Sequence, residues 1–377
     1  MFLLFLLILL FFIVKYDIRR QLGNKHKAFS FCVLILIILA AFRYRVGVDT
    51  MRLEDELKII PPIWDLNSNL FSGTRFAPGF IVFCSFLKIF SSEFVFYQLV
   101  QSLIVNICCC RFIYKNTHLP FIALFFYFFA AYLFFCYETS REGLAIALFL
   151  LLYDEKLLSW RNLLAVILCP LVHYGAIFVV VVMGLRKIDF GKKKNLLFMG
   201  ITFLVLWIVI TPEHFNNIPI LTTNEDLYYM YNHYFLESEG DDNLLYKIKI
   251  LLTLFPLAFL IFKKKEFIIH KTDIYNGFVV YVFLIFCGSF LPIINRLGNY
   301  FIIDFLIVLT WLIPSKNSKN MLMPLCFMIV FNFSFMTVYF NRVANSNARY
   351  YRRFIPYHSI LSMEKDYERE QMYKTEY

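Results

Sequence analysis

Long apolar stretches separated by short polar segments run along almost the whole chain of 377 residues. A helix needs about 20 predominantly apolar residues to cross a bilayer. Twelve stretches are apolar enough to be membrane spans: 1–14, 28–42, 76–90, 94–114, 119–137, 139–153, 163–183, 196–211, 246–262, 273–290, 297–313 and 321–340. We therefore predict an all-α polytopic integral membrane protein of about 11–12 transmembrane helices. The transmembrane bundle would cover residues 1–340, followed by a polar tail over residues 341–377.

Charged residues between the spans predict their orientation, because lysine and arginine collect in cytoplasmic loops. Basic residues mark three such loops, at residues 15–27, 184–195 and 263–272. Residues 212–246 hold seven acidic residues and no lysine or arginine, so we expect this segment outside, covering an external site. The second outward loop, residues 43–75, contains an amphipathic stretch at residues 51–60. Strict alternation also places the tail outside, despite its arginines.

The composition supports a membrane protein and excludes several other classes. Hydrophobic residues make up 60% of the chain and charged residues 17%, against roughly 45–50% and about 25% in soluble domains. The nine cysteines lie in or beside apolar runs without metal-ligand spacing, so we predict no metal and no cofactor. The net charge of +10 sits in short loops, which favours a lipid bilayer over a nucleic acid as partner. No Walker, G-x-G-x-x-G or D-x-D motif indicates use of a nucleotide.

An ionisable side chain in the bilayer costs about 2.5–3.5 kcal/mol on insertion scales, which makes each such group a functional candidate. The first group is Arg43, Arg45 and Asp49. Two guanidinium groups can bind phosphate oxygens in bidentate fashion. The alternative is an interfacial anchor that contains an arginine–aspartate pair. Arg75 and Arg296 lie at expected outer ends of other spans, where each is either an anion ligand or an ordinary interfacial arginine.

Arg141 stands at the start of an expected helix, where a cation opposes the helix dipole unless an anion is bound nearby. Thr139 or Ser140 is expected to cap this helix. The alternative for Arg141 is a simple ion pair with Glu138. A further candidate is His173, which follows a proline in an apolar segment. It is expected either to transfer protons or bind a ligand, or to be a hydrogen-bonded packing residue.

Five short motifs, in order along the chain, resemble elements of the EpsG family of Wzy-like polysaccharide polymerases. They are Arg43-Tyr-Arg-Val-Gly-Val-Asp49, Ala77-Pro-Gly-Phe80, Ser140-Arg-Glu-Gly-Leu-Ala145, His173-Tyr-Gly-Ala176, and Arg296 with Asn299-Tyr-Phe301. The first four resemble the family patterns R-Y-x-V-G-x-D, E-P-G-F, x-R-Q-x-I-A and F-H-x-S-A. The fifth resembles a late arginine and aromatic element. Four residues depart from the family patterns: Thr50 (usually Tyr), Ala77 (Glu), Glu142 (Gln) and Gly175 (Ser).

The resemblance implies a membrane glycosyltransferase with a GT-C-like helical bundle in the bacterial cell inner membrane. Its substrate would be oligosaccharide repeat units on undecaprenyl pyrophosphate, polymerised at the periplasmic face into O-antigen, capsule or exopolysaccharide. A chain-length regulator is a candidate partner. The expected catalytic residues are Arg141 and Arg296 at the pyrophosphate, with Asp49 or His173 as the base. Additional substrate-binding residues would be Arg43, Arg45 and Arg75.

Strict alternation of the twelve spans places Arg141 on the cytoplasmic side, away from this reaction. Arg141 moves outside if one segment within residues 76–114 does not cross and segment 163–183 re-enters at its proline break. We expect this second arrangement. Two rival functions remain: a flippase or other transporter of lipid-linked oligosaccharide, whose charges should line a path across the membrane, and an O-antigen ligase, which shares the lipid-linked substrate.

Overall fold

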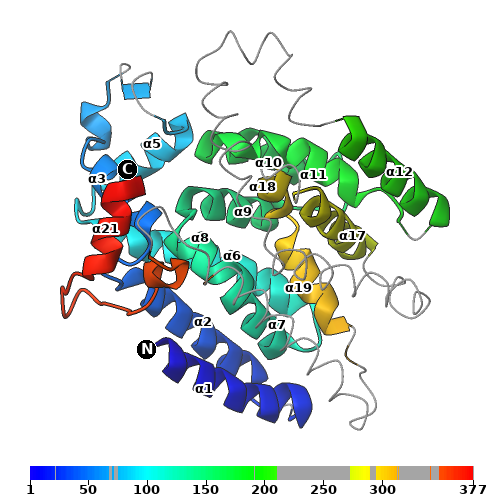
Figure 1. Ribbon diagram of the computed structural model, residues 1–377, viewed down its shortest axis with the longest axis horizontal. Coiled ribbons are helices and arrows are strands. Elements are labelled where there is room, and N and C mark those ends of the chain that lie inside the picture. The colour runs from blue at the N-terminus through cyan, green and yellow to red at the C-terminus, as the bar shows by residue number, and fades with distance from the viewer. Residues whose placement is uncertain are drawn as a thin grey trace. The chain divides into compact units, whose positions relative to one another are not determined.

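The computed structural model describes residues 1–21, 23–67, 70–71, 75–190, 192–209, 272–288, 294–311, 313, 340 and 348–376 (Figure 1). These residues belong to two compact units. Unit 1 comprises Met1–Val180 and Ile313–Tyr377, and unit 2 comprises Val181–Leu312. The expected span 246–262, most of the span 321–340, the acidic loop 212–246 and all but the last residue of the basic loop 263–272 lie outside the described residues.

The longest helices of unit 1 form where the sequence is continuously apolar. They are α1 (Phe2–Phe12), α2 (Lys25–Ala41), α6 (Phe94–Asn116), and the run of α7 (Pro120–Tyr127), a π-helical segment (Phe128–Tyr132) and α8 (Leu133–Tyr137). Two of these stretches, Phe94–Asn116 and Pro120–Tyr137, are long and apolar enough to cross a membrane. The all-helical architecture expected from the sequence is confirmed for the described residues, and it fits a membrane protein. The GT-C-like arrangement stays a prediction.

The helices α2 and α6 run antiparallel, which gives unit 1 two distinguishable ends. At one end, the Lys25 ammonium donates to the carbonyl oxygen of His118 at 3.1 Å. At the other end, α2 stops at Ala41, next to the start of α6. The phenol of Tyr137, which ends α8, donates there to the carbonyl oxygen of Leu39 at 2.9 Å. We call the first the Lys25 end and the second the Arg43 end.

Shorter helices gather at the Arg43 end or start from it. They are α3 (Val48–Leu57), α5 (Pro78–Leu87), α9 (Ser140–Leu152), α10 (Trp160–Val172) and the 3₁₀ segment η4 (Tyr174–Phe178). The expected amphipathic stretch is confirmed as α3, although the helix begins three residues earlier. The ten residues of α5 rise about 15 Å, half of the roughly 30 Å hydrocarbon core. The helix in segment 76–90 is therefore shorter than the single span expected there from the sequence.

The segment expected at residues 163–183 is broken rather than continuous. Pro170 lies inside α10, and the helix ends at His173, whose backbone is extended with φ −148°. Immediately afterwards, the hydroxyl of Tyr174 donates to the carbonyl oxygen of Phe76 at 3.2 Å. The chain therefore lies beside Phe76, at the Arg43 end, at this break, and the expected re-entry into the membrane stays a prediction.

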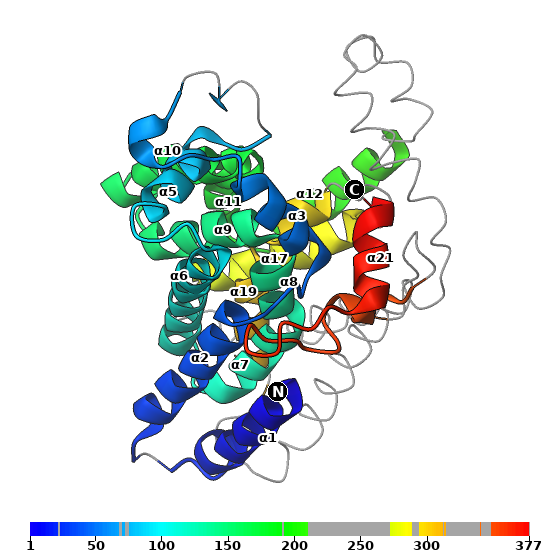
Figure 2. The same cartoon turned by 90° about the vertical axis from the view of Figure 1, so that its left-hand side faces the viewer.

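The C-terminal tail folds back onto the Arg43 end (Figure 2). A 3₁₀ turn, η8 (Tyr350–Arg353), precedes a terminal helix, α21 (Tyr367–Glu376). The amide of Tyr44 donates to the carbonyl oxygen of His358, and the amide of Ile360 donates to that of Phe42. The helix α21 packs against α3. A polar tail expected from the sequence is thus an ordered part of unit 1.

Unit 2 contains α12 (Lys193–Val209), α17 (Thr272–Cys287), α18 (Ile294–Gly298) and α19 (Ile302–Trp311), and α11 (Val179–Arg186) leads into it. The helices α17 and α19 pack together with Phe278 stacked on Phe305. Arg186 and Asp304 form a fully buried ion pair at 2.5 Å. Gly277 leaves room for this pair, because a Cβ atom there would overlap the Asp304 carboxylate.

Candidate functional site

The segment from Arg43 to Asp49 forms the turn that joins α2 to α3. Gly47 lies in this turn with φ +93°, a conformation that residues with side chains rarely adopt. A Cβ atom at this position would also overlap the carbonyl oxygen of Tyr137. The amide of Gly47 donates to the carbonyl oxygen of Arg353 at 2.8 Å. The glycine of this motif is therefore required by the close approach of three segments that are distant in sequence.

The carboxylate of Glu138 lies at the N-terminus of α3. It accepts hydrogen bonds from the amides of Val48 at 3.2 Å and Asp49 at 3.3 Å, which are donors without a partner inside the helix. From the tail, Arg353 donates to the same carboxylate at 2.8 Å, and both side chains are buried. Glu138 is thus committed to α3 and the tail. The alternative in which Glu138 pairs with Arg141 is wrong.

Arg43 binds groups of the protein itself. Its side chain is 1% exposed, and its guanidinium donates to the carbonyl oxygen of Ala40 and to the hydroxyl of Thr50. It also lies over the ring of Tyr137, 4.8 Å from the ring centroid. Thr50, one of the four departures from the family patterns, donates in turn to the carbonyl oxygen of Tyr137. These contacts fix the turn on α8.

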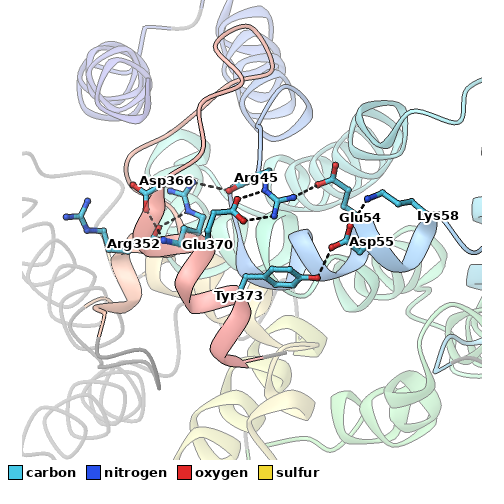
Figure 3. Close-up of polar contacts among 9 residues, drawn as sticks. Arg45, Glu54, Asp55, Lys58, Arg352, Asp366, Glu370 and Tyr373 are labelled. Carbon is cyan, nitrogen blue, oxygen red and sulfur yellow. Dashed lines mark hydrogen bonds and ion pairs between the residues drawn. The ribbon is translucent and has the colours of Figure 1, made fainter.

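Arg45 joins α3 to the terminal helix α21 (Figure 3). Its Nη2 donates to Oε2 of Glu370 at 2.8 Å and its Nε donates to the other carboxylate oxygen, which makes the pair bidentate. This hydrogen bonding raises the pKa of Arg45 above its ordinary value. Glu54 lies 3.6 Å from Nη1 of Arg45, and burial raises the pKa of Glu54. The same junction includes Tyr373, whose hydroxyl donates to Asp55 at 2.7 Å.

Arg75 lies at the surface of the same end. It forms an ion pair with Glu56 at 2.7 Å, and Arg52 binds the same carboxylate at 2.8 Å. The side chain of Arg75 is 42% exposed, so the pair contributes little to stability. Because Glu56 is shared by two arginines, this cluster carries a net positive charge.

Arg141, the second residue of α9, differs from the other arginines at this end. Its guanidinium lies over the ring of Phe76, 4.9 Å from the centroid, and the side chain is half-buried. Within the described part of the chain, Arg141 makes no ion pair and no side-chain hydrogen bond. The charges that act on it are those of Arg75, Glu56 and Asp49. A cation at a helix start is also unfavourably placed in the field of the helix dipole.

The hydroxyl of Thr139 lies directly before Arg141 at the start of α9. Thr139 is the N-cap residue, yet its side chain makes no capping hydrogen bond. Its Oγ is buried, and no group of the described residues binds it. Ser140 instead lies 3.3 Å from the hydroxyl of Tyr97, within hydrogen-bond distance. The expectation that Thr139 or Ser140 caps α9 is wrong, and among the described residues the hydroxyl of Thr139 and the guanidinium of Arg141 are left as donors for an anion.

The structure places the other expected site residues as follows. Asp49 lies in the first turn of α3, half-buried, and its charge acts on Arg141. His173 is half-buried at the break after α10, next to Tyr174, which binds the backbone of Phe76. The expected residues of unit 1 therefore gather at the Arg43 end. Arg296 is exposed on α18, in unit 2.

Two elements of this end were not anticipated from the sequence. The first is the bridging role of Glu138 between α3 and Arg353, and the second is the attachment of the tail through Glu370. The only sequence signal was the concentration of arginines in a tail expected on the outer side. Neither partner could be identified, because Arg353 and Glu138 are 215 positions apart and Arg45 and Glu370 are 325 positions apart.

Comparison with known proteins gives one match. The family model of the EpsG family matches residues 26–359, which is most of the chain. No curated protein and no solved structure matches the chain. The match covers the turn at Gly47, the start of α9 and the break at His173.

Proposed function

Because the chain belongs to the EpsG family, we propose that it polymerises undecaprenyl-pyrophosphate-linked oligosaccharide repeat units into a surface polysaccharide. In this reaction a hydroxyl oxygen of one unit attacks the anomeric carbon of the glycan carried by another lipid. The bond between that carbon and the pyrophosphate oxygen breaks, and undecaprenyl pyrophosphate leaves. The hydroxyl proton passes to a base of the protein.

The observation that supports this proposal most strongly is the state of Arg141. Every other expected arginine of unit 1 binds a carboxylate, a carbonyl oxygen or a hydroxyl of the protein. Arg141 makes no ion pair and no side-chain hydrogen bond among the described residues and lies over the ring of Phe76, although it is half-buried at a helix start. A leaving pyrophosphate would bind the guanidinium in bidentate fashion and would also suit the helix dipole. Fixed cations of this kind stabilise the charge that develops on the leaving group.

The remaining residues of this end supply the other requirements of the transfer. Arg75 adds positive charge beside Arg141. Asp49 is the favoured base, because its carboxylate lies within electrostatic range of Arg141. If Arg141 binds the pyrophosphate, the reacting carbon is held close to this carboxylate. His173 is the second candidate base, at the break that returns to Phe76. For Arg296 we keep the role expected from the family resemblance, which is to bind the pyrophosphate as a second cation.

We assign the Arg43 end to the periplasmic face of the bacterial inner membrane. The Lys25 end carries Lys15, Arg19, Arg20, Lys25 and Lys27, which are typical of a cytoplasmic loop. In this proposal α5 does not cross the membrane, so the chain stays at the Arg43 end between α3 and the start of α6. Arg141 then lies on the same side as the other site residues. This arrangement removes the conflict that strict alternation of twelve spans creates.

The test is the polysaccharide profile of a strain that lacks the gene, complemented with Arg141→Ala. We expect the long polymer ladder to be lost by a factor of at least about 100, with single units still at the surface, because one lost donor to a developing oxyanion costs about 10²–10³ in rate. Arg161→Ala is the matched control. Arg161 is the second residue of α10, and its guanidinium donates to the carbonyl oxygen of Leu151.

Other outcomes identify other functions. If all surface units disappear, the protein acts in export of the unit, as a flippase would. If polymer is made on lipid but is not transferred onward, the protein is a ligase. If both Arg141→Ala and Arg161→Ala give the wild-type ladder, the assignment of Arg141 to the pyrophosphate is wrong.

A further inference from the structure

A cavity of about 340 Å³ opens at the Arg43 end of unit 1. Four segments form its wall: the turn and α3, the end of α5, the start of α6, and residues 360–363 of the tail. Neither Arg141 nor Phe76 lines it. The volume falls within the range of about 300–1,000 Å³ that is typical of small-molecule sites, and it suffices for a mono- or disaccharide.

The cations that line this cavity are already bound by the protein. Arg45 is held by the bidentate pair with Glu370. Lys58 binds Asp55 at 2.6 Å. Lys88 donates to the carbonyl oxygen of Leu57, at the end of α3, at 2.7 Å. Arg43, the fourth cation, is engaged by the turn as described above. Each of these cations therefore has a partner in the protein, whereas Arg141 has no ion pair or side-chain hydrogen bond among the described residues, so we keep the pyrophosphate at Arg141.

Two lining groups with unused hydrogen-bonding capacity are carboxylates, the exposed Glu93 and the more enclosed Glu54. Glu54 has a side chain that is 26% exposed, and its one contact within the described residues is the ion pair with Arg45 at 3.6 Å, which exceeds hydrogen-bond distance. The aromatic rings of Tyr44 and Phe94 line the same space. Ser92 adds a hydroxyl. A carboxylate that accepts hydrogen bonds, together with rings that cover apolar C–H groups, suits a polyhydroxylated neutral molecule.

We propose that this cavity binds a neutral sugar residue of the glycan, with the Glu54 carboxylate accepting a hydrogen bond from a sugar hydroxyl. This inference rests on the proposed function, since it assigns the glycan and the pyrophosphate to different places at one end of the molecule. Arg141 and Thr139 hold the anionic part of the substrate, and the Glu54 cavity holds an uncharged part.

The tail determines part of the shape of this cavity. Ile360 and Met363 line it from the loop that pairs with residues 42–44. The side chain of Met363 is mostly exposed, so a larger residue there would fill the cavity without disturbing the buried core. Met363 is therefore a position at which the size of the bound sugar can be changed while Glu54 stays intact.

The test is a binding measurement on the purified full-length protein in nanodiscs. The probe is the oligosaccharide that mild acid releases from the lipid-linked units of the deletion strain, which carries the sugars but no pyrophosphate. We expect Glu54→Ala and Met363→Trp each to weaken its binding about tenfold or more, with Glu54→Gln in between. The matched control is Glu364→Ala, because this exposed carboxylate belongs to the same tail loop but does not line the cavity.

Two results would overturn the inference. One is wild-type binding of the oligosaccharide by both Glu54→Ala and Met363→Trp, with unchanged melting temperatures. The other is competition by inorganic pyrophosphate for the oligosaccharide in the Arg141→Ala protein, which would make the cavity an anion site.

These results are separable from a failure of the proposed function. A wild-type ladder in the Arg141→Ala strain, together with oligosaccharide binding that depends on Glu54, refutes the polymerase assignment and supports the sugar site. Loss of the ladder in that strain, together with binding that does not depend on Glu54, refutes only the sugar site.

Discussion

Two helix N-termini at the Arg43 end differ in how far the protein itself binds their polar groups. At the start of α3, the carboxylate of Glu138 accepts the first free amides, and Arg353 neutralises it. At the start of α9, the first turn contains the guanidinium of Arg141 next to the carboxylate of Glu142, and the N-cap hydroxyl of Thr139 has no partner among the described residues. At the start of α3, the free amides and the capping carboxylate therefore all have partners within the protein. The start of α9 keeps a guanidinium and a hydroxyl available to an anion, which the helix dipole would also favour.

This difference separates structural arginines from a functional one. Arg353 and Arg45 hold the tail on α3, and their charges are matched by carboxylates. Arg141 has no such match. An arginine whose partners are all part of the protein contributes to the folded state, so removing it should lower stability. Removing Arg141 should lower activity and leave stability nearly unchanged. Three further variants test this separation.

The largest effect on stability is expected for Arg353→Met. Breaking a buried ion pair leaves Glu138 with an uncompensated charge, which costs about 3–5 kcal/mol. A thermal melt of the detergent-solubilised protein would show a strongly lowered melting temperature. The control is Arg352→Met, because Arg352 pairs with Glu368 at the surface and should cost at most about 1 kcal/mol. Equal melting temperatures for the two variants would contradict a structural role for Arg353.

The second effect is expected for Gly47→Ala. The φ of +93° alone costs about 1–3 kcal/mol for a residue with a side chain, and the overlap with the carbonyl oxygen of Tyr137 adds to this. Melting temperature is again the readout. Gly184→Ala on α11 has nothing within 4 Å of the added atom, so it should be neutral or slightly stabilising. A stable Gly47→Ala protein would show that the turn can relax away from α8.

The smallest effect is expected for the pair of Arg45 and Glu370. A double-mutant cycle with Arg45→Gln and Glu370→Gln should give a coupling of about 1 kcal/mol, since the pair is bidentate but partly exposed. The same variants should release α21 from α3, which limited proteolysis of the tail would detect. High salt should reduce the coupling. A coupling near zero would mean that Tyr373 and the loop pairing at residues 42–44 suffice to hold the tail.

The sequence predicted most of the helical segments of the described residues, because apolar runs of sufficient length leave the backbone no alternative in a bilayer. It was less successful in deciding which runs are long enough to cross. The run 76–90 contains the ten-residue helix α5, which starts at Pro78 and stops before the polar residues from Lys88 onward. The break at His173 followed from Pro170, since a proline inside a helix removes a hydrogen bond and introduces a steric clash.

By itself, the sequence determined the helical class, the family and the residues that stand beside the spans, because these depend on local composition and on short motifs. Only the tertiary structure decided which arginines bind carboxylate, carbonyl or hydroxyl oxygens of the protein. Arg43, Arg45 and Arg141 all lie in segments that resemble family motifs, yet the first two bind oxygen atoms of the protein and the third lies over an aromatic ring. Their partners come from positions up to 325 residues away, and a pairing over that distance is fixed by how the helices pack rather than by any local pattern.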